Sequence, residues 1–440
     1  MKTIIHNARL VLTDRDAPAV GYVVVSGDIV SNVGIGPAPQ RLLDLADETV
    51  DAAGALLMPG AIDCHVHFRE PGLTHKATMA SESRAAAAGG VTSWIDMPNT
   101  SPATTSARVW EDKCGIASAT AVGNYGFFIG VTDDNIDMLP HLDFRQVPGV
   151  KLFMGQSTGN MAVSGRTVER VMAEVDAPVV VHAEDDKVIA ANLARLRTEY
   201  GDGELPVELH SRLRDTEACL RATDRIMELA ARYGTRLHLA HVSTAAESSM
   251  LDSGPVSGKR ITAEVSPHHL WWSDGDYGRR GARIKMNPAV KTDHDRQMLR
   301  QALRTDRLDS VATDHAPHLA ADKAGDLLHA ASGAPLVQFS LPAMLTLYND
   351  PCLVARKMSQ SPAEIFGISR RGRIAPGWYA DLVLVESGPW TVSDDDVLSL
   401  CGWTPLAGEQ LDWRVTRTWI NGKAPDRAGA QLAFNVHNNR

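Results

Sequence analysis

Positive charge is scarce in this sequence. Asp and Glu number 53 against 44 Lys and Arg, which gives a formal net charge of -9. Because no run of Lys or Arg offsets this excess, neither the net charge nor its pattern favours nucleic-acid binding. An acidic small molecule would therefore need a local source of positive charge.

Long apolar runs are also missing. No stretch reaches the ~20 consecutive apolar residues that a membrane-spanning helix requires. The opening MKTIIHNARLVLTD has no basic segment followed by a long apolar core and a small-residue cleavage site, the pattern of a secretion signal. We therefore expect a cytoplasmic protein with no membrane partner.

The cysteines form no pattern. They are odd in number, widely scattered and never in a CxxC spacing, which argues against both a disulfide framework and a zinc knuckle. The five are Cys64, Cys114, Cys219, Cys352 and Cys401.

The two ends of the chain have the texture of short strands. At about 150 residues per domain, 440 residues predict two or three domains, although barrels absorb more. Apolar or β-branched runs bounded by turn residues occur in the first 58 residues, as in GYVVVSGDIVSNVG, and again near the end, as in RGRIAPGWYADLVLVE. We predict one small β-sandwich domain built from residues 1–58 and 365–440.

Residues 59–364 alternate between strand-like and helix-like segments. Eight apolar runs occur: GAIDCHVH, GVTSWIDMPN, ATAVGNYGFFIGV, GVKLFMG, APVVVHAED, RLHLAHVS, ITAEVSPHH and LDSVATDHAPH. Helix-like stretches lie between several of them, including THKATMASESRAAAAG, TVERVMAEV and DTEACLRATDRIMELAARYG. This order predicts an α/β protein with a (β/α)₈ TIM barrel, whose active site forms at the C-terminal ends of the strands.

Ionisable residues recur where these predicted strands end. Far apart in the chain, they are expected to converge at one mouth of the barrel. Four histidines and a carboxylate supply enough ligands for one or two borderline divalent cations, of which zinc is the commonest. The residues are His65, His67, Lys151, His182, His241 and Asp314.

Each of these residues also has a structural interpretation. A single HxH motif is often incidental, and a lone histidine in an apolar strand is more often a hydrogen-bonded interior residue than a ligand. Asp314 is compatible with a helix cap, and Lys151 with a lysine whose stem is buried and whose amine reaches solvent. Independent structural residues have no reason to fall at five different strand ends, so the shared position favours the metal site.

Lys151 needs a chemical explanation within such a site. An ammonium has three donors and no lone pair, so it cannot bind a cation. Lys151 can serve only after deprotonation or after reaction with carbon dioxide to form a carbamate, whose two anionic oxygens can bridge two metals.

Several blocks of the sequence resemble the amidohydrolase superfamily and, within it, the dihydroorotase family. The resemblance runs from MPGAIDCHVHFREPGLTHKATMASESRAAAAGGVTSWIDMPNTSPATT through GVKLFMGQSTGNM, VVVHAED, LHLAHVS, SPHHL, KMNPAVKT and ATDHAPH to RGRIAPGWYADLVLV. It implies reversible cyclisation of N-carbamoyl-L-aspartate to L-dihydroorotate in pyrimidine synthesis. Two stretches depart from the common pattern, NPAVKT and SGAPLVQFSLP.

The resemblance also implies roles for individual residues. It places two Zn²⁺ ions per chain, one held by His65 and His67 with Asp314 and the other by His182 and His241. A carbamate on Lys151 is expected to bridge them, and Asp314 to act as the acid/base group. Residues implied in substrate binding are Arg69, Asn99, Asn287, His318 and the backbone of Gly333. Related enzymes are often dimers or tetramers, so we expect a homo-oligomer.

Arg69 discriminates among the possible substrates. Hydantoinases, dihydropyrimidinases and allantoinases resemble dihydroorotases in architecture and ligands, so metals alone cannot choose the cyclic amide. Dihydroorotate carries a ring carboxylate that hydantoin lacks, and a guanidinium matches a carboxylate at two points. Strand alternation in HxHxR aims Arg69 into the same cavity as the histidines. A structural ion pair with Glu70 or another carboxylate is the competing interpretation.

The same residues are compatible with two different functions. One is that of a hydantoinase or allantoinase acting on a neutral ring. The other is that of an inactive dihydroorotase-like partner in an assembly, although all six expected ligand positions are filled.

One loop is a candidate for a mobile flap over the site. The segment GQSTGNM, residues 155–161, is rich in glycine and small polar residues, and Ser157 and Thr158 within it are candidates for substrate contact. An ordinary solvated loop explains the same composition.

Overall fold

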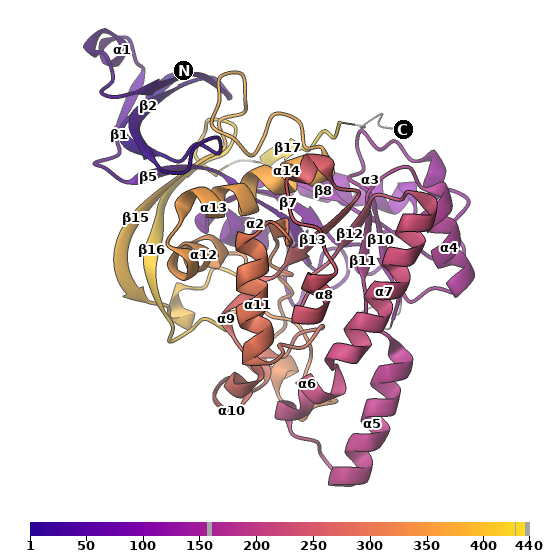
Figure 1. Cartoon of the computed structure of the whole chain (residues 1–440). Coiled ribbons are helices and arrows are strands. Elements are labelled where there is room, and N and C mark those ends of the chain that lie inside the picture. Colours follow the sequence, from indigo (N-terminus) through magenta and orange to yellow (C-terminus); the bar gives the residue numbers. More distant parts are fainter. Residues whose placement is uncertain (156–160, 427, 436–440) are drawn as a thin grey trace.

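The computed structural model describes residues 1–155, 161–426 and 428–435 (Figure 1). Ser157 and Thr158 lie outside the described residues. Within the described chain, no helix combines the length and apolar character needed to cross a bilayer.

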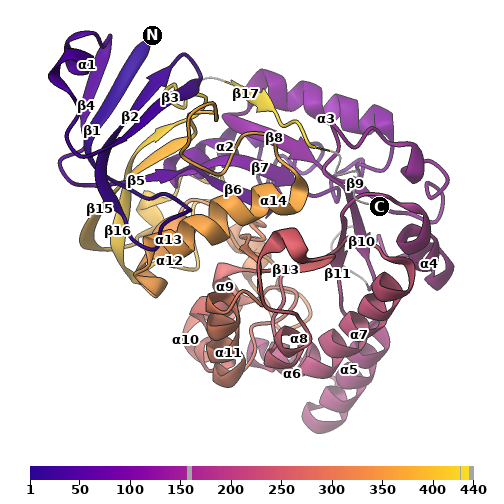
Figure 2. The same cartoon turned by 45° about the horizontal axis from the view of Figure 1, so that its top comes forward.

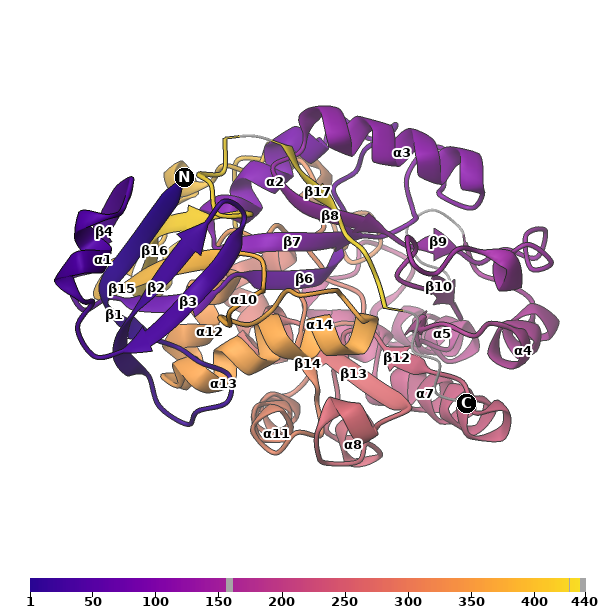
Figure 3. The same cartoon turned by 90° about the horizontal axis from the view of Figure 1, so that it is seen from above.

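Strands from both ends of the chain form one seven-stranded sheet. Its order is β16-β15-β5-β1-β2-β3, and β4 pairs with β1. The strands are β1 (Lys2–Leu10), β2 (Ala19–Ser26), β3 (Ile29–Ile35), β4 (Glu48–Asp51), β5 (Leu56–Pro59), β15 (Leu382–Thr391) and β16 (Gln410–Trp419). Figure 3 shows the indigo N-terminal strands beside the yellow C-terminal ones.

An apolar cluster holds the two ends of the chain together. Leu10 and Val23 from the N-terminal strands are buried in the same cluster as Leu382 and Trp419 from the C-terminal ones. Burying such side chains contributes about 1.5–3 kcal/mol each. The apolar and β-branched runs that were visible at both ends of the sequence therefore supply this shared core.

The middle of the chain is mixed α/β, as expected. Its strands pair in parallel and in chain order, from β6 to β8 in one sheet and from β9 to β14 in another, and a parallel bridge joins Val66 to His315. The strands are β6 (Ala61–Val66), β7 (Val91–Asp96), β8 (Gly123–Phe127), β9 (Ile129–Gly130), β10 (Val150–Phe153), β11 (Val179–His182), β12 (Leu237–Leu239), β13 (Ile261–Val265) and β14 (Ser310–Val311). Parallel strands are usually covered on both faces, which explains why these read as continuous apolar runs.

Helices lie between many of the strands of the described chain. They are α1 (Gln40–Asp44), α2 (Met79–Ala88), α3 (Ala107–Thr120), α4 (Gly165–Glu174), α5 (Asp186–Tyr200), α6 (His210–Leu213), α7 (Thr216–Tyr233), α8 (Ala245–Ser249), α9 (Pro267–Trp271), α10 (Tyr277–Arg280), α11 (Asp293–Arg304), α12 (Ser340–Tyr348), α13 (Pro351–Ala355) and α14 (Ser361–Phe366). The three segments predicted as helical correspond to α2, α4 and α7. In α7 the Asp215 side chain caps the N-terminus, and Gly234 ends the helix in the left-handed conformation.

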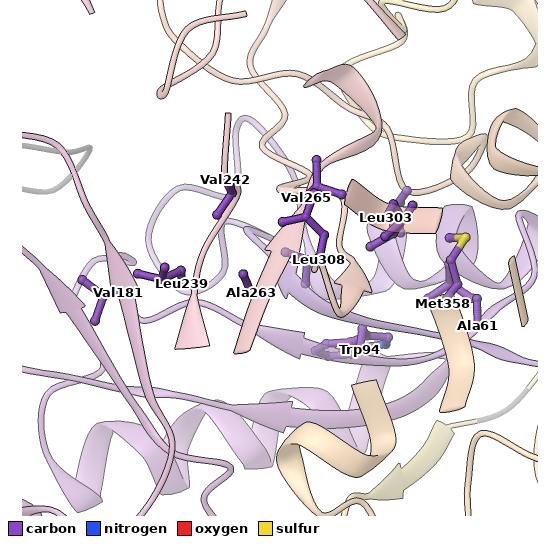
Figure 4. Packing of buried hydrophobic residues seen from close by; sticks show 14 of the residues in the cluster. Ala61, Trp94, Val181, Leu239, Val242, Ala263, Val265, Leu303, Leu308 and Met358 are labelled. Atoms are coloured by element: carbon purple, nitrogen blue, oxygen red, sulfur yellow. The ribbon is translucent and has the colours of Figure 1, made fainter. Parts of the chain in front are cut away.

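The largest apolar core lies between these strands and helices. Figure 4 shows members from distant segments, including Trp94 of β7, Val265 of β13 and Leu303 of α11. A short C-terminal strand, β17 (Ala428–Gln431), pairs in parallel with β8 at the edge of the four-stranded sheet, as Figure 2 shows. The apolar core and the strand pairing hold the strands in place. Most candidate site residues lie at or just beyond the C-terminal ends of these strands, and Lys151 lies within β10.

Candidate active site and metal centre

One cavity collects nearly all of the predicted site residues. Its lining includes the six predicted ligands and also Arg69, Asn99, Asn287 and Gly333. These residues come from positions as far apart as 65 and 333, and they converge because the parallel strands all end on the same side. His318 does not line the cavity directly but contacts Arg69.

His65, His67 and Asp314 form the first group of candidate ligands. The Nε2 atoms of His65 and His67 lie 3.4 and 3.0 Å from Asp314 Oδ1. Their potential ligand atoms all fall within 4.8 Å of one another, a spacing that suits three ligands of a single cation.

His182 and His241 form the second group. The Nδ1 atom of His182 lies 3.0 Å from Nε2 of His241, so both nitrogens face the same space. The His241 ring is also close to that of His65, with 5.2 Å between centroids. The two groups are therefore neighbours in one cavity.

Lys151 is fully buried beside both groups. Its Nζ atom has no hydrogen-bond partner among the described residues, and it lies 5.3 Å from the centroid of the Phe153 ring. Burial lowers the pKa of Lys151 to about 8, partly offset by Glu264 and Asp314. A neutral amine is accordingly far more accessible here than on a surface lysine, and neutral amines are the form that reacts with carbon dioxide.

Burial and neighbouring charges set the protonation of the other candidates. Desolvation lowers the pKa of His67 to about 4 and also lowers the pKa of His182 and of His241. Burial alone would raise the pKa of Asp314, but the imidazoles of His65 and His67 hold it well below its usual range. His67, His182 and His241 thus offer neutral imidazoles and Asp314 an ionised carboxylate, the forms that bind divalent cations.

Three site residues have strained backbones. Arg69, His241 and Asp314 adopt positive φ angles of 66°, 37° and 50°. Such conformations cost about 1–3 kcal/mol each for residues other than glycine and occur preferentially at functional sites. Just past their strands, these turns redirect the side chains into the cavity.

Arg69 supplies a positive charge on one side of the cavity. Arg69 is buried, and its Nε donates to the Pro317 carbonyl, while Nη2 lies 3.0 Å from His318 Nε2. Among the described residues no carboxylate lies within 4.0 Å of its guanidinium, and Glu70 instead accepts from the Met79 amide. The ion-pair interpretation of Arg69 is therefore wrong.

Burial lowers the pKa of Arg69 to about 10. The same effect, with Arg69 and Lys76 nearby, holds the pKa of His318 far below its usual range, so its imidazole is neutral. Arg69 thus offers a buried positive charge on this side of the cavity to a bound anion.

Asn99, Asn287 and Gly333 line the cavity, and each also makes polar contacts within the protein. The Asn99 amide oxygen lies 2.8 Å from His67 Nδ1, and Asn287 Oδ1 lies 3.1 Å from His210 Nε2. The backbone N–H of Gly333 donates to Lys285 and its carbonyl accepts from Lys323. Contacts between these residues and a substrate stay predictions. Gly333 itself has a φ of 130°, which only glycine adopts readily.

Two glutamates that sequence reasoning missed complete the site. Glu264 Oε1 lies 2.5 Å from His65 Nδ1, and Glu184 Oε2 lies 2.9 Å from His182 Nε2. Each glutamate thereby fixes which nitrogen of its histidine faces the cavity. Glu184 follows His182 by two positions, so strand alternation could have indicated that the two side chains share a face. Glu264 is 199 residues from His65, and no local pattern indicates their contact.

These residues fit two divalent cations. Every candidate histidine directs a nitrogen at another candidate ligand, and three of them have their second nitrogen held by Glu264, Asn99 or Glu184. The unpartnered amine of Lys151 lies beside both groups. A donor set of imidazoles and carboxylates with orientation by outer partners is typical of zinc.

Comparison with known proteins gives consistent relatives. The chain matches the amidohydrolase family over residues 56–424. A dihydroorotase of Halobacterium salinarum is 37% identical over 391 residues, covering 84% of this chain and 89% of the relative. A dihydroorotase of Methanosarcina acetivorans is 37% identical over 422 residues, covering 92% and 88%.

Other similar proteins carry different names. An allantoinase of Rubrobacter xylanophilus is 33% identical over 428 residues and covers 93% of both chains. Among solved structures, an L-hydantoinase (dihydropyrimidinase) from Arthrobacter aurescens superposes with a TM-score of 0.87 at 24% identity, covering 99% of this chain and 98% of that one. This last likeness concerns the fold alone.

Proposed function

The chain belongs to the amidohydrolase family, and from that premise we propose that it is a dihydroorotase. It would catalyse the reversible hydrolysis of the cyclic amide bond of L-dihydroorotate to N-carbamoyl-L-aspartate, a reaction whose reverse, the cyclisation, belongs to pyrimidine synthesis. A cyclic amidohydrolase is what the family and the named relatives have in common.

The architecture we propose has two parts. The parallel pairing from β6 to β14, together with the bridge between Val66 and His315, supports a (β/α)₈ barrel over residues 59–364. The seven-stranded sheet supports a small β-sandwich domain from residues 1–58 and 365–440. A homo-oligomer and a cytoplasmic location stay predictions.

We propose that the cavity holds two zinc ions. His65, His67 and Asp314 would hold one, and His182 and His241 the other, with Lys151 bridging as a carbamate. When bound, the ions supply Lewis acidity, which lowers the pKa of a water molecule and polarises the ring carbonyl. The buried, unpartnered Nζ of Lys151 supports the carbamate.

Asp314 would move the proton in this reaction. Its carboxylate is ionised, since His65 and His67 hold its pKa well below the usual range, and it faces the cavity between them. It would accept the proton of the attacking water and deliver it to the ring nitrogen as the amide bond breaks, which avoids expulsion of an amide anion. In the cyclisation direction it would take the proton from the carbamoyl nitrogen.

The observation that carries the substrate assignment is the buried charge of Arg69, which forms no ion pair with a carboxylate among the described residues. A buried cation without a carboxylate partner is costly, and a carboxylate on the substrate would supply that partner. The neutral His318 imidazole would orient the guanidinium through the 3.0 Å contact with Nη2. The ring carboxylate of dihydroorotate meets this requirement, whereas hydantoin has no such group.

A substrate panel on zinc-reconstituted protein tests this assignment. We expect kcat/KM for L-dihydroorotate to exceed that for hydantoin, dihydrouracil and allantoin by at least about a hundredfold, the effect of two lost charge-assisted hydrogen bonds. Faster turnover of hydantoin or allantoin would favour a cyclic amidohydrolase acting on neutral rings, and such names also occur among the relatives. Zinc content well below one equivalent, with no turnover after reconstitution, would favour an inactive assembly partner.

A further inference from the structure

A second cavity lies at the opposite ends of the strands that carry the metal site. It has a volume of about 640 Å³ and is lined by Pro178, His238 and Thr262, at or near the starts of β11, β12 and β13. The ligands His182 and His241 lie at or beyond the far ends of β11 and β12. Because a strand rises about 3.3 Å per residue, four residues of β11 separate the two cavities by roughly 13 Å. The second cavity is therefore distinct from the active site.

Basic side chains dominate the lining of this rear cavity. They are Arg236, Lys259, Arg260, Arg370, Arg371 and Arg373, against one lining carboxylate, Glu364. Such an excess of positive charge is unexpected in a chain whose net charge is -9. A concave surface with one sign of charge concentrates oppositely charged ligands.

Three of these cations already have carboxylate partners. Lys259 pairs with Asp309, Arg371 with Asp381, and Arg373 with Glu364. These pairs fix the cavity wall and leave little positive charge for a ligand.

Arg236 and Arg370 are different. In the described chain neither has a carboxylate within 4.0 Å, since Arg236 donates to the Ile365 carbonyl and Arg370 to the Tyr379 hydroxyl. Arg236 is half-buried, and burial lowers its pKa, an effect that Asp176 opposes and Arg260 reinforces. No carboxylate of the described residues forms an ion pair with its guanidinium, so it can still bind an anion directly.

The remaining wall of the cavity is partly apolar. The half-buried Val256 and the half-buried Trp378, whose ring is flat, line it beside polar residues such as Ser369. Volumes of about 300–1,000 Å³ are typical of small-molecule sites, and the mixture of apolar wall and convergent polar groups is typical as well. The two features together describe a ligand with an anionic end and a flat, partly apolar body.

We propose that the rear cavity binds a phosphomonoester with a flat ring, of the size of a nucleoside monophosphate. Guanidinium groups match phosphate oxygens in two-point geometry, and a phosphate dianion would balance Arg236 and Arg370 together. The ring would lie against the apolar part of the wall, to which Val256 and Trp378 contribute.

Calorimetric titration of the zinc-loaded protein tests this binding. The ligands are adenosine and uridine 5′-monophosphate, inorganic phosphate and uncharged adenosine, all at one ionic strength. We expect saturable binding of at least one monophosphate, at least about tenfold tighter than inorganic phosphate or adenosine. Equal affinity for inorganic phosphate would overturn the ring assignment, and no saturation by either monophosphate up to millimolar concentrations would overturn the site.

Matched variants localise the binding. Arg236→Met and, separately, the exposed Arg370→Met should each weaken the monophosphate at least about tenfold, while Arg108→Met on the exposed face of α3 should not. Turnover of dihydroorotate without nucleotide should stay unchanged in all three. Equal affinities across the three variants would contradict the assignment. A change in sedimentation on mutating Arg370, without nucleotide binding, would instead identify the cavity as an interface between copies of the chain.

A second inference comes from buried hydrogen bonds between side chains of the parallel strands. It rests on the proposal that His65 binds a metal ion. Glu264 is buried between two histidines, with Oε1 at 2.5 Å from His65 Nδ1 and Oε2 at 3.2 Å from His238 Nε2. The His238 Nδ1 atom in turn lies 2.9 Å from Thr262 Oγ1. These hydrogen bonds connect His65, a candidate ligand, with Thr262 in the lining of the rear cavity.

We infer that Glu264 is a positioning residue for His65. By accepting the Nδ1–H, it selects the tautomer whose Nε2 lone pair faces the metal site, and it holds the ring in place. His238 and the His241 amide bind the two carboxylate oxygens and so keep Glu264 from turning away.

Zinc affinity of the metal-free protein, measured by chelator competition, tests this role. Glu264→Ala should weaken binding by about 10–100-fold, and Glu264→Gln, which keeps one acceptor, should restore part of the loss. The control is Glu247→Gln, because Glu247 is equally buried but bonds Thr223 and Thr244. Equal zinc affinity in all variants would contradict the positioning role, and it would do so whether or not dihydroorotate proves to be the substrate.

Discussion

Replacing Arg69 with methionine separates substrate recognition from folding. The structure gives the guanidinium no carboxylate within 4.0 Å among the described residues, so no buried anion is orphaned when the charge is removed. The substrate carboxylate, by contrast, would lose two charge-assisted hydrogen bonds of about 1.5–3 kcal/mol each. At about 1.4 kcal/mol per factor of ten, kcat/KM for dihydroorotate should fall by roughly 10²–10⁴.

The assay pairs steady-state kinetics with thermal unfolding. Arg371→Met is the matched control, because that arginine is equally buried but pairs with Asp381. Breaking a buried pair costs about 3–5 kcal/mol, so the control should lose far more in Tm than Arg69→Met does. Turnover of dihydroorotate within about tenfold of the parent in Arg69→Met would refute the reasoning, as would an equal loss on a neutral ring.

The remaining predictions concern the metal site and the frame that holds it. Lys151→Ala should lose bound metal, with partial rescue by short-chain carboxylates, as metal analysis would reveal; full occupancy would count against the bridge. In metal-free protein at a fixed concentration of dissolved ¹³CO₂, the rate of carbamate formation should rise with pH through about 8, because the pKa of Lys151 is lowered to about 8 and only the neutral amine reacts; a rise centred near 10.5 would contradict the shift. Asp314→Asn should keep its circular dichroism spectrum and lose nearly all turnover, and preserved turnover would exclude the proton transfer. Lys113→Met, which breaks the fully buried pair with Asp96 at 2.5 Å, should lower the unfolding free energy by about 3–5 kcal/mol in denaturant titration, and a loss under about 1 kcal/mol would contradict the importance of that pair.

Much of the site follows from patterns that are local in the sequence. His65, His67 and Arg69 alternate in the sequence and all reach the cavity, although β6 ends at Val66 and a turn with positive φ, not strand alternation, aims Arg69. His182 and Lys151 stand within predicted strands whose parallel arrangement follows from the βα alternation. Their convergence needed only the rule that parallel strands end on the same side.

Interactions between distant segments could not be predicted in this way. Glu264 lies in a strand that the sequence revealed, yet nothing local indicates that it meets His65. The rear cavity depends on Arg236 and Arg370, which come from different loops and share no period. Strand β17 pairs with β8 although about 300 residues separate the two strands, and nothing in the four residues of β17 predicts this contact.

Crystallography of the zinc-loaded protein, with anomalous scattering at the zinc edge, tests the central claim most directly. The account predicts two peaks, one bound by His65, His67 and Asp314 and the other by His182 and His241, with density for a carbamate beyond Lys151 Nζ joining them. A single peak, or a free amine on Lys151 with both metals in place, would contradict it.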